Sequence, residues 1–197
     1  QAIGCVDQNL QITACAGSGK TDVVSRRIAE LLMLPGVRPA NIVAFTFTEK
    51  AAAELKDRVL RRVQDAGGST LGLAEMFIGT MHAFCLDILQ RYVPETFRYR
   101  VLTEVTNRLF IDRHSRASGL TSCPVMSAKV IHLRRYQDSK LYQSVLSLLR
   151  EDEVDADAVP DGVWEAFDQY LHLLSQKSYF DYTAMIQVAV ELLESEN

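Results

Sequence analysis

The chain has 197 residues, of which 48% are hydrophobic and 23% charged, and this composition is that of a globular protein with one or two domains. Its formal charge of −4 excludes a polycation that adheres to nucleic acid over its whole surface, so any nucleic-acid contact must come from a local patch. No apolar run approaches the roughly 20 residues that span a bilayer and no secretory signal is recognisable, so we expect a cytoplasmic protein without membrane contact.

The first ninety residues alternate short apolar runs with longer helical patterns, which is typical of a parallel sheet with crossover helices. Thr48 stands at the N-cap of the second predicted helix, and Pro94 ends the third. The predicted strands cover 9–14, 41–47 and 76–78, and the predicted helices cover 20–34, 49–63 and 81–93.

Beyond Pro94 strands largely disappear, and helices are predicted over 104–116, 141–149, 163–175 and 182–194. Between Arg98 and Arg135 there are eight basic residues against two acidic ones. This excess could form a surface that faces DNA phosphates, or it could be a set of ordinary solvated helix faces, and the sequence leaves both interpretations open.

The loop after the first predicted strand reads A-C-A-G-S-G-K-T, from Ala14 to Thr21, and departs from the strict phosphate-binding pattern only in having Ala14 for glycine. Gly17 and Gly19 allow backbone N–H groups to converge on a β-phosphate, and a following helix adds the positive end of its dipole. Lys20 would reach the β- and γ-phosphates, and Thr21 would offer its hydroxyl to Mg²⁺. The predicted ATP–Mg site therefore comprises Ala14, Cys15, Ala16, Gly17, Ser18, Gly19, Lys20 and Thr21, with Lys20 and Thr21 in the catalytic roles.

Three motifs in order, "ACAGSGKT", "AFTFTEKAAAELKDRV" and "IGTMHAFCLDIL", resemble the N-terminal RecA-like domain of UvrD/Rep-type superfamily 1 DNA helicases. The resemblance implies an α/β P-loop NTPase fold, with a RecA-like parallel sheet flanked by helices and a mostly α-helical inserted subdomain of the kind called 1B. It assigns 1–91 to the first part of the ATP-binding domain, 92–178 to the insertion and 179–197 to a helix that returns to the first domain.

The resemblance also implies roles for residues outside the loop. Arg58 would lie near the nucleotide, and the single-strand contacts would be Phe47, Thr48, Thr80, His82 and Phe84. Phe47 could instead be buried at the end of an apolar strand, His82 could be a structural histidine, and Arg58 could belong to a solvated basic face.

Two departures from the family pattern limit what the chain alone is expected to do. Asp22 stands where the family more often has a basic residue, and the acidic Walker B pair, which holds Mg²⁺ and polarises water, is not found. Glu151 begins an acidic run, but the preceding apolar spacing is helical, whereas a Walker B acid ends a strand. The chain therefore resembles a fragment that stops short of that motif, and we expect it to lack ATPase activity by itself.

The leading functional prediction is an ATP-dependent DNA helicase whose parent protein moves 3′-to-5′, as the resemblance implies. Its expected partners are single-stranded DNA, junctions of single- and double-stranded DNA, and a second RecA-like domain. The alternatives are a P-loop phosphotransferase resembling a nucleotide kinase, and a non-catalytic ATP- or DNA-binding module. Excision repair, replication restart and recombination are not distinguished by these residues.

Overall fold

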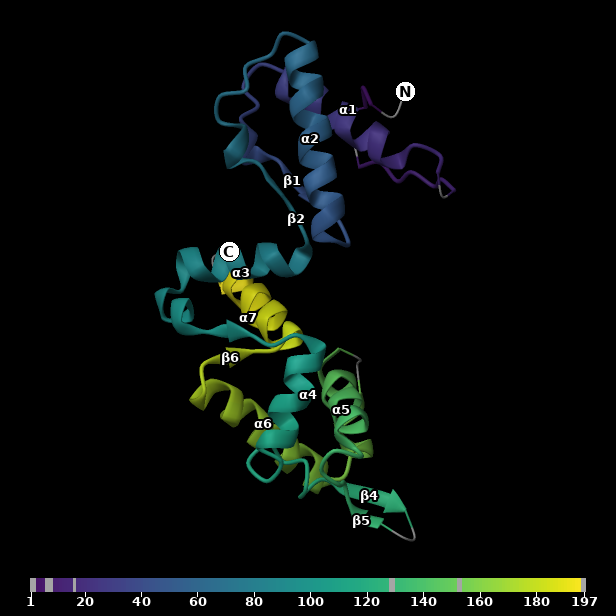
Figure 1. Cartoon of the computed structure of the whole chain (residues 1–197), viewed down its shortest axis with the longest axis vertical. Coiled ribbons are helices and arrows are strands. Elements are labelled where there is room, and N and C mark those ends of the chain that lie inside the picture. The colour runs from purple at the N-terminus through teal and green to yellow at the C-terminus, as the bar shows by residue number, and fades with distance from the viewer. Residues whose placement is uncertain (1–2, 6–8, 16, 128–129, 152–153, 196–197) are drawn as a thin grey trace. The chain divides into compact units, whose positions relative to one another are not determined.

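The computed structural model describes residues 3–5, 9–15, 17–127, 130–151 and 154–195, and the chain divides into two compact units, residues 1–84 and 85–197 (Figure 1). We describe each unit by itself. Within the described ranges, no helix is long and apolar enough to cross a membrane.

Unit 1 alternates helices and strands from α1 to the start of α3, as the sequence predicts for residues 20–84. Thr48 is the N-cap of α2, and its hydroxyl oxygen accepts from the Ala51 N–H at 3.1 Å, which confirms the predicted helix start. The elements are α1 (Lys20–Leu32), η1 (Pro39–Asn41), β1 (Val43–Phe45), α2 (Glu49–Asp65), η2 (Leu73–Glu75) and β2 (Phe77–Gly79), followed by the start of α3 (Met81–Tyr92).

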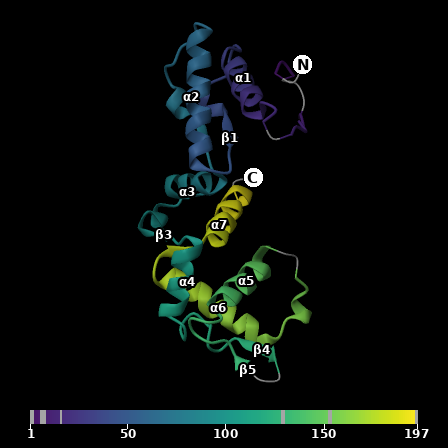
Figure 2. The same cartoon turned by 45° about the vertical axis from the view of Figure 1, so that its right-hand side comes forward.

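The sheet of unit 1 has two parallel strands, β1 and β2, with Val43 opposite Phe77 and Phe45 opposite Gly79. Helices α1 and α2 lie side by side, and both contribute to one apolar core with Ile42 and Ile78 of the strand region (Figure 2). Because side chains alternate across a strand, the opposite side carries Val43 and Phe45, which stay exposed. The core between helices and sheet includes Ile28, Ala29, Ile42, Ala52, Leu55, Val59, Val63, Met76 and Ile78.

The strand predicted over 9–14 is not formed, and this is a correction to the sequence analysis. A strand is stable only when a neighbour receives its backbone hydrogen bonds, and no strand in the described ranges pairs with this segment. Leu10 and Ile12 are accordingly exposed. The apolar pattern was present, but its partner was not.

Unit 2 is mostly helical, with two short strand pairs that the sequence analysis did not predict. β3 (Arg100–Val101) pairs in parallel with β6 (Tyr179–Phe180), and β4 (Pro124–Ser127) forms an antiparallel hairpin with β5 (Val130–His132). The remaining elements are η3 (Pro94–Arg98), α4 (Glu104–Arg113), α5 (Ser139–Glu151), η4 (Ala156–Ala158), α6 (Asp161–Gln176) and α7 (Tyr182–Ser195). The helix predicted over 104–116 therefore ends three residues early, and α5 extends beyond the predicted 141–149.

Unit 2 has two apolar clusters. The larger joins α4, α5 and α6 around the fully buried Tyr142 and Tyr170, and the smaller joins α3 to β6 and α7 through Leu89 and Met185. Gly119 lies against α6 with a φ of +79°, and a Cβ there would collide with the backbone of Ala166. The predicted boundaries at 91/92 and 178/179 stay predictions.

Candidate nucleotide and nucleic-acid site

The loop before α1 is built by two left-handed glycines. Gly17 and Gly19 have φ values of +76° and +86°, conformations that residues with a Cβ rarely adopt. Between them the Ser18 hydroxyl donates to the Cys15 carbonyl at 2.7 Å, which closes the turn. The 13-residue helix α1 therefore begins directly after Gly19, and a helix N-terminus favours a nearby anion. Ala16 lies outside the described residues.

Lys20 folds its side chain back over this loop. Its Nζ donates to the carbonyls of Ala14 and Cys15 at 2.9 and 2.6 Å, and the residue remains exposed. Both acceptors are neutral carbonyls, so these two bonds leave the charge of the Lys20 ammonium uncompensated. Lys20 is thus held against the loop, and its contact with a phosphate stays a prediction. Thr21, the predicted Mg²⁺ ligand, is exposed beside it on the first turn of α1.

The Asp22 carboxylate forms ion pairs with two arginines, which were not predicted from the sequence. Its carboxylate accepts from Arg26 Nε at 3.0 Å, one turn along α1, and from the Arg62 guanidinium on α2. Arg62 Nε also donates to the buried Ser25 hydroxyl at 3.1 Å. This cluster ties α1 to α2 and balances the negative charge of Asp22 beside the loop. Arg58, one turn before Arg62 on α2, is exposed.

Phe47 is fully exposed just beyond β1, so the alternative that it is buried in the core is wrong. In the sequence, an aromatic residue after an apolar strand is consistent with both a buried and an exposed ring. The structure distinguishes them, because strand pairing ends at Phe45, two residues before Phe47. Thr48 points its hydroxyl at the first turn of α2 and is exposed. The role of both residues in DNA binding stays a prediction.

Thr80 lies near the start of α2 because β1 and β2 are parallel and their carboxyl ends share one edge. The Thr46 N–H donates to the Gly79 carbonyl at 2.9 Å, and the Thr80 hydroxyl donates to Glu49 Oε1 at 2.9 Å. Glu49 was not among the predicted site residues. The structure therefore brings the segments 46–49 and 79–80 together at the edge where ligands of open parallel sheets commonly bind.

Phe84 belongs to an aromatic cluster with Phe45 and Phe77. Its ring centroid lies 5.2 Å from that of Phe45 and 4.9 Å from that of Phe77, both edge to face. Gly79 is needed here, since a Cβ would lie 2.7 Å from the Phe77 ring. Phe84 is therefore packed against the sheet, whereas His82, on the first turn of α3, is half-buried.

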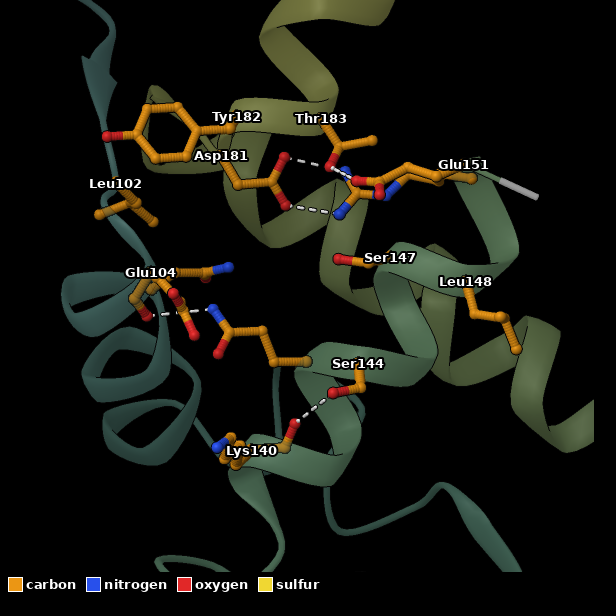
Figure 3. A pocket seen from close by; sticks show the side chains of 13 residues that line it. Leu102, Glu104, Lys140, Ser144, Ser147, Leu148, Glu151, Asp181, Tyr182 and Thr183 are labelled. Carbon is orange, nitrogen blue, oxygen red and sulfur yellow. Dashed lines mark hydrogen bonds and ion pairs between the residues drawn. The ribbon is translucent and has the colours of Figure 1, made fainter. Parts of the chain in front are cut away.

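A separate polar pocket of about 470 Å³ lies in unit 2 between α4, α5 and the start of α7 (Figure 3). Among the lining residues, Arg150 Nη1 and Nη2 donate to both carboxylate oxygens of Asp181 at 2.8 and 2.7 Å, with the two side chains only 5% and 6% exposed. Tyr170 Oη lies 2.6 Å from Asp181 Oδ2, and the Ala184 N–H donates to Asp181 Oδ1 at 2.8 Å. The Thr183 hydroxyl, also in the lining of the pocket, donates to Glu151 Oε1 at 2.5 Å.

Burial alone would raise the pKa of Asp181, but the hydrogen bonds and charge of Arg150, together with those from Tyr170 and Ala184, hold that pKa below its usual value. Burial and the neighbouring carboxylate raise the pKa of Tyr170, which stays a neutral hydroxyl. Among the described residues, no buried side-chain N or O atom lacks a hydrogen-bond partner, so the network has the character of a structural ion pair. Glu151 belongs to α5, so the acidic run at 151–153 begins in a helix; Asp152 and Glu153 lie outside the described residues.

A family model and three known proteins that match this chain are each described as a helicase or helicase domain. The family model described as "UvrD/REP helicase N-terminal domain" matches residues 1–197. ATP-dependent DNA helicase PcrA of Staphylococcus aureus is 29% identical over 98% of this chain and 26% of its own length. ATP-dependent DNA helicase SRS2 of Saccharomyces cerevisiae is 40% identical over 43% of this chain and 7% of its own, and a probable DNA helicase of Mycoplasma pneumoniae is 28% identical over 100% and 36%. The chain thus spans only about a quarter to a third of the relatives that it matches over its full length.

Proposed function

Because this chain belongs to the UvrD/REP helicase N-terminal domain family, we propose that it forms the ATP-binding and single-strand-binding region of an ATP-dependent DNA helicase. The observation that supports the proposal is the presence, in the same unit, of a glycine loop contacted by Lys20 and a fully exposed Phe47 at the carboxyl edge of the sheet. One feature suits a phosphate and the other suits a base.

The loop from Ala14 to Thr21 receives the phosphates of ATP. Lys20 exchanges its two carbonyl acceptors for phosphate oxygens, and the N–H groups of the first turn of α1 face the same anion. Thr21 presents one hydroxyl ligand to Mg²⁺, which usually completes its shell with phosphate oxygens and water. Bound Mg²⁺ would neutralise charge that develops on the phosphates. Arg58 approaches the nucleotide from α2.

Unpaired DNA lies along the edge formed by the ends of β1 and β2. A base stacks on Phe47, and such stacking tolerates any sequence because every base has a π-face. Thr48 and Thr80 border the same edge, while His82 and Phe84 follow on the first turn of α3. The contact between Thr80 and Glu49 links the two halves of this edge.

Hydrolysis, unwinding and 3′-to-5′ movement are proposed for the whole protein, acting through a second RecA-like domain at junctions of single- and double-stranded DNA. A phosphotransferase resembling a nucleotide kinase would leave the exposed Phe47 without a role, and a non-catalytic module would bind ATP and DNA without coupling them. The exposed ring favours the helicase over the phosphotransferase.

Two binding experiments on the 197-residue chain test the proposal. Lys20→Ala should weaken binding of a fluorescent ATP analogue by about tenfold or more, since hydrogen bonds to charged groups contribute about 1.5–3 kcal/mol, whereas the exposed Lys56→Ala should not. Phe47→Ala should weaken binding of oligo-dT by about fivefold or more, and Leu71→Ala, a matched exposed apolar change in the same unit, should leave it unaltered. Equal affinities for Lys20→Ala and Lys56→Ala would contradict the assignment of the loop.

A further inference from the structure

A second cleft in unit 2, which we call the basic cleft, has a volume of about 680 Å³ and gathers four exposed cations. Each comes from a different part of the fold: Arg100 from β3, Arg113 from the end of α4, Arg135 from the turn after β5 and Lys177 from the residue after α6. The carboxylate in the lining belongs to Asp112, which is buried. The accessible surface of the cleft is therefore positive although the chain as a whole is acidic.

The four cations share the cleft without neutralising partners. In the described part of the chain none of them forms an ion pair, whereas Arg91, Arg134 and Arg150 in the same unit each do. Their field is felt locally: burial first, then the charges of Lys177 and Arg113, lower the pKa of His114 in the cleft wall. Like charges held together in this way favour an anionic ligand.

Helix dipoles account for only part of this arrangement. A helix C-terminus favours a nearby cation by about 0.3–1 kcal/mol, which suits Arg113 and Lys177 at the ends of α4 and α6. Arg100 and Arg135 lie on a strand and a turn, where no such dipole acts. Their convergence on the cleft needs another explanation.

An aromatic ring is displayed at the rim of the cleft by a strained turn. Tyr136 is 62% exposed with a left-handed φ of +65°, which is uncommon for an aromatic residue, and the Arg135 guanidinium carbon lies 4.5 Å from its ring centroid. Asp112 Oδ1 accepts from the Tyr136 N–H at 2.8 Å, and Asp138 Oδ2 accepts from the Arg134 N–H at 2.8 Å. Two carboxylates thus hold the turn in this conformation.

A second residue with a left-handed φ lies in the chain between Lys177 and Tyr179, which both line the cleft. Ser178 also has a left-handed φ, of +55°, and its carbonyl accepts from the Arg100 N–H at 3.0 Å. In the described ranges, Tyr136 and Ser178 are the non-glycine residues with positive φ, and both flank the basic cleft. Strained backbone of this kind clusters where a fold holds functional groups in place.

We propose that the basic cleft binds an unpaired nucleic-acid strand, with phosphates on Arg100, Arg113, Arg135 and Lys177 and a base stacked on Tyr136. The proposal goes beyond the site proposed for unit 1 and shares no residue with it. An isolated phosphate would leave the ring unused, and a base inside a duplex could not stack on it. The combination of a cationic groove and an exposed ring is the one that single strands require.

The test measures fluorescence anisotropy of labelled oligo-dT with the whole chain in a Phe47→Ala background, which reduces the contribution of unit 1. Arg113→Gln with Arg135→Gln should weaken binding by about tenfold or more. It should also lower the slope of log K against log salt by about 1.4, since a single-strand phosphate contact contributes roughly 0.7. The control, Arg98→Gln with Arg116→Gln, removes two exposed arginines of the same unit that do not line the cleft. Equal weakening by both pairs would overturn the proposal in favour of diffuse electrostatic binding.

The ring is tested by Tyr136→Asn, because asparagine tolerates the left-handed conformation, and by Tyr136→Phe, which keeps the stacking surface. We expect Tyr136→Asn to weaken oligo-dT binding about fivefold or more, Tyr136→Phe to preserve it, and neither to alter binding of polyphosphate. A polyphosphate affinity that matches oligo-dT and an indifferent Tyr136→Asn would show a plain polyanion site and overturn the proposal. If Phe47→Ala alone has no effect while the cleft variants do, the site proposed in unit 1 fails and the basic cleft stands.

Discussion

Removing the charge of Asp181 should destabilise unit 2 strongly. Asp181→Asn leaves the Arg150 guanidinium, 5% exposed, without its counter-ion and places an amide N–H₂ against a donor. Breaking a buried ion pair by removing one partner costs about 3–5 kcal/mol, because the remaining charge stays desolvated. The expected loss is therefore a large part of the stability of a small domain.

The assay is urea unfolding followed by tryptophan fluorescence. Trp164 is the only tryptophan of the chain and lies on α6, so its emission reports on the unit that contains the pair. With an m value of about 2 kcal/mol/M, the midpoint for Asp181→Asn should fall by about 1.5–2.5 M. Asp168→Asn, the same change at an exposed position of α6, should stay within about 0.5 kcal/mol of the parent.

A double variant separates the ion pair from the other roles of Asp181. Arg150→Met combined with Asp181→Asn removes both charges and retains an acceptor for the Ala184 N–H, so it should recover much of the loss. A loss of less than about 1 kcal/mol in the free energy of unfolding for Asp181→Asn would contradict this explanation. So would a double variant whose loss equals the sum of the losses in Arg150→Met and Asp181→Asn.

Three further predictions follow from the same contacts. The folded-state pKa of Asp181 is depressed, so its ionised carboxylate stabilises unit 2 fully above the unfolded-state pKa of about 3.9. This contribution to the free energy of unfolding is lost as pH falls through the lower folded-state pKa, and Asp181→Asn should reduce the pH dependence of stability in urea titrations below about pH 4. Arg62→Leu should lower stability by at most about 1 kcal/mol, since the ion pair with Asp22 is 30–36% exposed, and a thermal melt showing a larger loss would contradict this. Gly119→Ala should cost at least about 2 kcal/mol in the same urea assay, through collision with α6 and backbone strain. Gly67→Ala has a positive φ in open space and should cost about 1 kcal/mol, measured by circular dichroism in urea because Gly67 lies in unit 1 and Trp164 in unit 2.

Local signals in the sequence located most helices correctly. Thr48 caps α2 as predicted, α1 begins at Lys20 after the glycine loop, and α3 and α7 begin at Met81 and Tyr182. Each of these starts depends on residues within one or two turns, which a sequence displays directly. The unusual backbone conformation of Gly17 and Gly19 was predictable for the same reason, whereas ATP binding by the loop stays a prediction.

Features that depend on distant partners were not predictable. The segment 9–14 has the pattern of a strand but no pairing strand in the described ranges, while β3 and β6 have two residues each and pair across nearly eighty positions. The ion pairs of Asp22 with Arg62 and of Arg150 with Asp181 join separate helices or loops, and no local periodicity indicates them. Phe47 and Phe84 were both predicted to contact single-stranded DNA. In the structure Phe47 is fully exposed, whereas Phe84 is packed in an aromatic cluster.

The most direct test of the helicase assignment is steady-state ATP turnover by the full-length protein that carries this sequence, measured with and without single-stranded DNA. The account predicts that DNA raises turnover severalfold or more and that Lys20→Ala abolishes it both with and without DNA. Turnover that is indifferent to single-stranded DNA, or that survives in Lys20→Ala, would contradict the assignment.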